Sequence, residues 1–232
     1  TTLAVWGIER RVQPVERPRE ETCFIDGLQE VWGETAARHF TIFVFLSMIA
    51  YFMQELILEP YAGLVFGFTP GQSTSLSGAH YGGVFLGMLT VGIMATGLRI
   101  GSLRAWVVAG CLGSAASLGA ITMLGGPAVT STLTPAVIAL GFFNGMFAVA
   151  AIGSMMALAG QGRGSREGTR MGLWGAAQAI AAGFGGLTGA AAVDIMRRVM
   201  DDGPAFGTVF AFEAALFFAS ALMAARIMEN SR

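Results

Sequence analysis

Long apolar stretches alternate with short polar ones along the chain. A helix that crosses a membrane takes about 20 mostly apolar residues, and six stretches meet this requirement. They lie at 40–58, 80–98, 105–124, 135–159, 171–193 and 206–226. The pattern therefore predicts an all-α, integral membrane protein with six transmembrane helices.

Glycine and proline mark the expected ends of these spans. Glu59-Pro60 is expected to close the first span, and a loop over 60–79 then leads to the second. Similar turn signals follow the later spans at 125–127, 162–164 and 202–204.

The first part of the chain is more polar and predicts a different organisation. Residues 1–8 are expected to be the end of a preceding membrane helix, so that the chain is part of a longer one. Residues 9–39 form a cytoplasmic linker, and 40–232 form the six-helix bundle. Within the linker, Phe24, Leu28, Val31 and Trp32 recur at helical spacing. This spacing predicts a short amphipathic surface helix, which either contacts lipid or packs on the bundle.

Composition agrees with a membrane protein and adds a prediction about packing. Only 12% of the residues are charged, whereas soluble domains carry about 25%. Glycine pairs at four-residue spacing let the backbones of neighbouring helices approach closely. Such pairs predict close helix contacts at Gly83 and Gly87, Gly141 and Gly145, and Gly185 and Gly189.

The arginines predict the orientation. If the segment before the first span is cytoplasmic, twelve of the 14 basic residues fall on the cytoplasmic side and only Arg197 and Arg198 fall outside. Basic residues concentrate in cytoplasmic loops, so both ends of this chain are expected in the cytoplasm. The net charge of −1 argues against nucleic acid as a partner.

Three carboxylates lie in or beside the predicted spans. Glu55 and Glu59 share one helix face near the outer end of the first span, where they are either part of a polar site or interfacial anchors. Glu213 lies inside the sixth span. A charge at that depth is costly, so Glu213 is expected to face the bundle, where it is paired, hydrated or protonated.

Two segments resemble signatures of the PucC family. One is Gln54–Gly63, which includes Tyr61, and the other is Arg170–Ile180, followed by Gly185-Gly186 and Val193-Asp194. Members of this family are bacteriochlorophyll-associated membrane proteins of phototrophic bacteria that assist light-harvesting complex assembly. They are similar to the major facilitator superfamily, which has twelve helices in two six-helix halves. The resemblance maps this chain onto the C-terminal half.

The resemblance implies a non-enzymatic, chaperone-like assembly factor in the inner, photosynthetic membrane. Its expected partners are light-harvesting polypeptides, the reaction-centre complex, membrane lipids and the N-terminal half of the same protein. Bacteriochlorophyll or carotenoid is the expected cofactor, with no free metal. The alternative is a secondary transporter of an amphiphilic or pigment-like substrate. Against transport, Leu98 stands where the facilitator loop motif has an acidic residue before Arg99-Ile100-Gly101.

Several further side chains are candidates for pigment or partner binding. His80 is expected to begin the second span, where its neutral imidazole is either an axial ligand of a chlorophyll magnesium or a locally bonded interfacial group. Asn144 and Gln178 either bond between helices or offer an oxygen to magnesium. An aromatic surface on the first span is expected to dock a partner or a pigment ring. Its members are Phe40, Phe43, Tyr51 and Phe52.

No catalytic constellation is visible in the sequence. The only histidines are His39 and His80, and the two cysteines, Cys23 and Cys111, lie far apart. The sequence has no nucleophile elbow and no phosphate-binding loop. These observations predict that the protein is not an enzyme.

Overall fold

A computed structural model describes residues 24–124, 130–160 and 167–227, and helices account for almost all of them. Six of the helices are long and apolar enough to span a membrane, which confirms the predicted fold class. The elements are α2 (Phe24–Gly33), α3 (Thr35–Phe66), α4 (Pro70–Val91), the π-helical turn η1 (Gly92–Gly97), α5 (Leu103–Met123), α6 (Thr130–Ala159), α7 (Glu167–Met196) and α8 (Asp202–Ile227).

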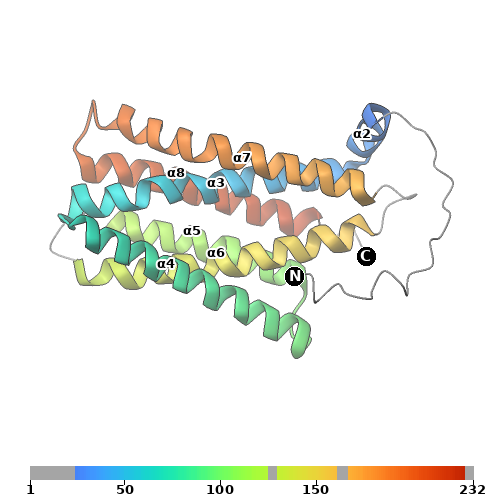
Figure 1. The fold of residues 1–232 in the computed structure, drawn as a ribbon, viewed down its shortest axis with the longest axis horizontal. Coiled ribbons are helices and arrows are strands. Elements are labelled where there is room, and N and C mark those ends of the chain that lie inside the picture. Colours follow the sequence, from blue (N-terminus) through green and yellow to red (C-terminus); the bar gives the residue numbers. More distant parts are fainter. Residues whose placement is uncertain (1–23, 125–129, 161–166, 228–232) are drawn as a thin grey trace, which may run out of the picture.

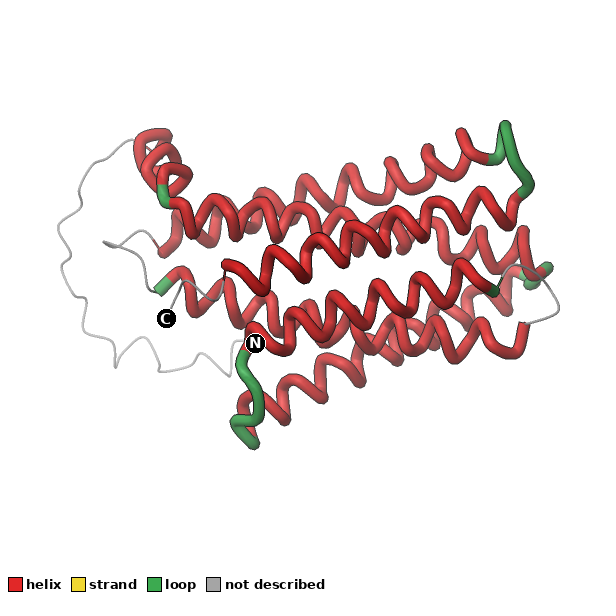
Figure 2. Tube along the Cα trace, turned by 180° about the vertical axis from the view of Figure 1, so that it is seen from behind, coloured by secondary structure: helices red, strands yellow, loops and turns green. Residues whose placement is uncertain are grey.

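The six long helices lie side by side as one antiparallel bundle (Figure 1). Helix α3 packs mainly against α7 and α8, while α6 packs against α4 and α5, and α5 also packs against α8. The turns after α3 and α7 lie at one end of the bundle, and α2 lies at the opposite end (Figures 1 and 2). The outer faces of α4 and α7 are the least covered by the rest of the described chain.

The first span is longer than the sequence predicts. The end of this helix was expected at Glu59-Pro60, but α3 continues through Pro60 to Phe66. Its C-cap is Gly67, whose φ is 71°. A proline inside a membrane helix is tolerated because neighbouring groups satisfy the freed carbonyl. The left-handed conformation at Gly67 is the true stop signal, since glycine adopts it without steric cost.

The second span begins earlier than predicted. Instead of a loop over 60–79, only residues 67–69 separate the two helices, and α4 begins at Pro70. Thr69 and Gln72 form a capping box: the Thr69 side chain accepts from the Gln72 N–H, and the Gln72 side chain accepts from the Thr69 N–H at 2.9 Å. This cap starts a helix in polar sequence that hydropathy alone assigns to a loop. His80 therefore lies inside α4 and not at its start.

The predicted glycine contacts are confirmed at two helix crossings. A Cβ added to Gly83 or Gly87 would meet the backbone of α6, and a Cβ on Gly141 or Gly145 would meet the backbone of α4. At the α3–α7 crossing, a Cβ on Gly189 would lie 2.9 Å from the carbonyl oxygen of Met53. Only a hydrogen atom fits at these positions, so glycine determines how closely the helices approach.

One buried arginine joins the helices at the end of the bundle where α2 lies. Arg170 is 2% exposed, and its guanidinium donates to both carboxylate oxygens of Glu34, at 2.6 and 3.2 Å. One turn further along α7, the Trp174 indole donates to Thr41 at 3.1 Å. The signature segment 170–180 thus attaches α7 to the start of α3, directly after α2. In α2 itself Val31 is buried and Trp32 is 45% exposed.

Most of the described arginines lie at one end of the bundle, as the sequence predicts. Arg38, Arg99, Arg104, Arg170 and Arg226 belong to helix ends and turns on the side of α2, and Arg197 and Arg198 follow α7 at the other end. Which end faces the cytoplasm stays a prediction. Residues 1–8, residues 9–23 of the linker and the arginines within 161–166 lie outside the described residues.

Candidate functional site

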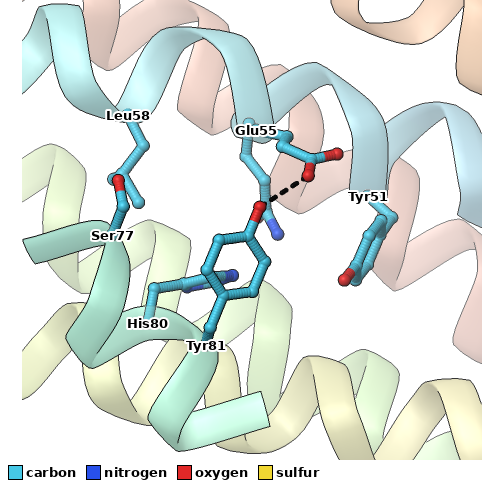
Figure 3. A pocket seen from close by; sticks show the side chains of 7 residues that line it. Tyr51, Glu55, Leu58, Ser77, His80 and Tyr81 are labelled. Carbon is cyan, nitrogen blue, oxygen red and sulfur yellow. Dashed lines mark hydrogen bonds between the residues drawn. The ribbon is translucent and has the colours of Figure 1, made fainter. Parts of the chain in front are cut away.

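A polar pocket lies between α3 and α4, in the half of the bundle near the α3–α4 turn. Figure 3 shows its side chains pointing toward one another from the two helices. The pocket is lined by Tyr51, Gln54, Glu55, Leu58, Ser77, His80 and Tyr81.

Two hydrogen bonds of the same kind join the helices at this pocket. The Tyr81 hydroxyl donates to Glu55 at 2.7 Å, and the Ser77 hydroxyl donates to Glu59 at 2.6 Å. On each helix the two residues are four apart, and the helices run in opposite directions. A pair of acceptors on one face of α3 therefore meets a pair of donors on one face of α4. Both carboxylates remain exposed beside these bonds.

The floor of the pocket contains polar atoms that no described residue satisfies. His80 is 7% exposed and Gln54 is 1% exposed. His80 Nδ1 and Gln54 Oε1 have no hydrogen-bond partner among the described residues. The free volume is about 20 Å³, which is room for about one water molecule.

The other predicted polar candidates lie outside this pocket. Tyr61 is buried, donates to the carbonyl of Ile121 at 3.1 Å and packs on α8. Asn144 accepts from Ser114 at 2.8 Å, which is the interhelical bond expected of an amide in a span. Gln178 contacts the sulfur of Met48 at 3.6 Å. Glu213 is completely buried, as its position predicts.

The aromatic docking surface is wrong in part. Phe40 and Phe43 are 0% exposed, with Phe40 packed against Trp174 and Phe43 near Phe147. They belong to the core because α3 is a central helix with neighbours on several sides. Tyr51 and Phe52 are partly exposed and contact each other, so they can still contribute to a binding surface.

Ser77 and Tyr81 were not predicted as pocket residues from the sequence, and Gln54 was named only as the first residue of a family signature. A signal for them was present. Ser77 and Tyr81 have the same four-residue spacing as Glu55 and Glu59, and consecutive helices in a membrane pair in antiparallel order. The predicted loop over 60–79 hid this match, because it placed Ser77 outside any helix.

The pocket provides one carboxylate, an imidazole, an amide and three hydroxyls, and a second carboxylate, Glu59, is bonded to its Ser77. Such groups can bind a polar segment of another polypeptide, hold water or offer a nitrogen ligand. Among the described residues no cluster of three or more His, Cys, Asp or Glu side chains could hold a metal ion.

Comparison with known proteins adds the family. The chain is 64% identical to the "Bacteriochlorophyll synthase 44.5 kDa chain" of Rhodobacter capsulatus over 98% of its own length and 53% of that relative's. It is 28% identical to "Protein PucC" of Cereibacter sphaeroides, over 99% of the chain and 50% of that protein. The chain spans about half the length of the curated relatives it matches.

No solved structure matches the chain significantly. The family model described as "PUCC protein" matches residues 1–232. This match agrees with the resemblance found in the segments 54–63 and 170–180. The chain therefore belongs to the PUCC protein family and is a multi-pass membrane protein of that family.

Proposed function

We propose that this protein is an assembly factor for photosynthetic light-harvesting complexes that binds light-harvesting polypeptides, bacteriochlorophyll or both in the membrane. The single observation that carries the proposal is the exposed polar pocket on the α3–α4 face. Carboxylates within membrane helices are costly unless polar groups cover them, and Glu55 and Glu59 are exposed beside Tyr81 and Ser77. A partner segment with hydrogen-bond donors would cover them.

The family and the relatives support the same proposal. One relative carries bacteriochlorophyll in its name, and another carries the family name. The name of the first relative speaks of a synthase, but the Ser77 and Tyr81 hydroxyls bond to carboxylates and not to His80, the contact by which a histidine would activate a nucleophile. We therefore propose a binding role without turnover, in the inner, photosynthetic membrane.

Bacteriochlorophyll or carotenoid is a proposed ligand of this face. His80 fits in chemistry, because its Nδ1 has no partner among the described residues and a neutral imidazole nitrogen is a magnesium ligand. The pocket does not fit in size, since a free volume of about 20 Å³ cannot enclose a chlorin ring. A ring would lie across the mouth of the pocket, near Tyr51 and Tyr81, and the buried His80 would bind its magnesium only if its side chain turned toward the mouth.

The rest of the same protein is a second proposed partner. Since the curated relatives are about twice as long as this chain, a further segment of similar size is expected to pack on it. The faces of α4 and α7 offer exposed glycines with open space beside them, such as Gly78 and Gly172. Small residues of this kind suit close contact with another helix.

The test isolates the full-length, affinity-tagged protein from phototrophic membranes in mild detergent and measures the light-harvesting polypeptides and bacteriochlorophyll retained per protein. We expect His80→Phe to lower the pigment retained several-fold and Glu55→Gln to lower the polypeptides retained. The matched control is His39→Phe, which changes the other histidine, exposed at the α2 end. Retention of neither pigment nor polypeptide by the unaltered protein would refute the proposal.

The alternative, a secondary transporter of an amphiphilic or pigment-like substrate, draws support from the six-helix bundle and from the buried Glu213. Uptake of a pigment precursor into vesicles under a proton gradient, lost in Glu213→Gln, would favour it over the assembly role.

A further inference from the structure

Glu213 is a carboxyl group without any described neighbour to neutralise it. It is 0% exposed, and neither carboxyl oxygen has a hydrogen-bond partner among the described residues. The ion pairs of the described chain lie at the ends of the bundle, at Arg170–Glu34 and Arg197–Asp202. An ionised carboxylate in this position would be very costly.

The contacts of Tyr61, which lies closer to the α3–α4 turn than Glu213 does, show which helices surround Glu213. The Tyr61 hydroxyl of α3 donates to the carbonyl of Ile121 in α5 at 3.1 Å. The Tyr61 ring lies 5.4 Å from the ring of Phe206 in α8 and 5.0 Å from that of Phe210. Helices α3, α5 and α8 therefore meet at this level.

Two helical turns further from the α3–α4 turn, the same faces of α3, α5 and α8 carry polar residues. Seven residues bring a helix back to nearly the same face, about 10.5 Å along its axis. From Tyr61 this step leads to Gln54, from Ile121 to Ser114, and from Phe206 to Glu213. Because α8 runs opposite to α3 and α5, all three steps go toward the middle of the bundle.

A fourth helix contributes to this level through Ser114. The Ser114 hydroxyl donates to Asn144 Oδ1 in α6 at 2.8 Å, while Asn144 Nδ2 has no described partner. Gln54 Oε1 is likewise without a described partner. We name this set the polar layer, and all its members are buried: Gln54, Ser114, Asn144 and Glu213.

We propose that the polar layer is a binding site for a proton and enclosed water, with the proton held on Glu213. The chemistry of the unpartnered atoms is complementary. A protonated Glu213 has one hydroxyl donor for Gln54 Oε1 and one carbonyl acceptor for Asn144 Nδ2. Buried polar atoms in native proteins find partners, and water bridges those that do not touch directly.

The polar layer also adjoins the candidate site. Gln54 lines the pocket that contains Glu55, His80 and Tyr81, and it shares its stripe on α3 with Tyr61, which faces α5 and α8. The pocket is therefore a polar approach to the layer through Gln54, and protons would reach Glu213 from this side.

Infrared spectroscopy of the full-length protein at neutral pH tests the site. A protonated carboxylic acid has a C=O stretching band that carboxylates lack. We expect one such band, lost in Glu213→Gln and kept in Glu59→Gln. We also expect Asn144→Leu or Gln54→Leu to shift the band, because each removes a polar group that the enclosed water would connect to the carboxyl group. These two variants decide the matter even if Glu213→Gln does not fold.

Two results would overturn the proposal. The absence of the band in the unaltered protein would mean that Glu213 is ionised, and a sodium-dependent carboxylate signal would then identify a bound cation in place of the proton. A band that is lost in Glu213→Gln but unmoved in both leucine variants would show an isolated carboxyl group and no layer.

Discussion

At the scale of single residues, the buried Arg170 makes a charge-assisted pair with Glu34. A planar guanidinium matches both oxygens of a carboxylate, and the compact ammonium of lysine cannot. The Arg170 side chain also reaches toward the carbonyl of Ala159 at 3.5 Å, so one side chain connects α3, α6 and α7. The bonds from Arg170 to Glu34 and from Trp174 to Thr41 account physically for the arginine and the tryptophan of the second signature segment.

We expect Arg170→Lys to lower the free energy of unfolding by about 1–3 kcal/mol, since it removes one arm of a charge-assisted pair. The matched control is Arg197→Lys, whose pair with Asp202 is about one third exposed and should cost about 0–1 kcal/mol. Denaturant titration in mixed micelles measures both. Equal losses in the two variants would contradict the importance given to Arg170.

At the scale of elements, glycine positions the helices. The crossing of α4 and α6 is built from glycines on both helices, and each approaches the backbone of the other. Neighbouring glycines on α4 differ completely in this respect: Gly83 faces α6, and Gly82 faces open space.

We expect Gly83→Ala to destabilise the bundle by about 1–3 kcal/mol, because the added methyl overlaps the backbone of α6. Gly82→Ala, one residue away, should be neutral or stabilising by about 0.5–1 kcal/mol, since alanine favours the helix. Thermal unfolding of the two purified variants compares them directly. A loss of stability in Gly82→Ala as large as that in Gly83→Ala would show that the contact with α6 is not the reason why alanine destabilises position 83.

At the scale of the whole molecule, the distribution of arginine predicts which end lies in the cytoplasm. Gly33, at the end of α2, and Gly71, at the start of α4, are exposed at opposite ends of the bundle, so cysteines at these positions can be labelled.

In a Cys23→Ser background, with Cys111 buried, we expect an impermeant thiol reagent applied to spheroplasts to label Gly71→Cys and not Gly33→Cys. Permeabilised cells, in which both positions should react, provide the control. Labelling of Gly33→Cys alone would reverse the orientation.

The sequence by itself determined the number of spans, the glycine crossings, the gathering of arginines at one end and the burial of Glu213. These features depend on local composition and on helical periodicity, and the membrane imposes them on each segment separately.

The tertiary structure alone decided which polar groups meet. The extension of α3 through Pro60 and the capped start of α4 brought Ser77 opposite Glu59 and Tyr81 opposite Glu55. Burial of Phe40 followed from the central place of α3. Such pairings depend on the register and rotation of helices that are distant in sequence. No single segment encodes them, because they result from the packing of all six helices together.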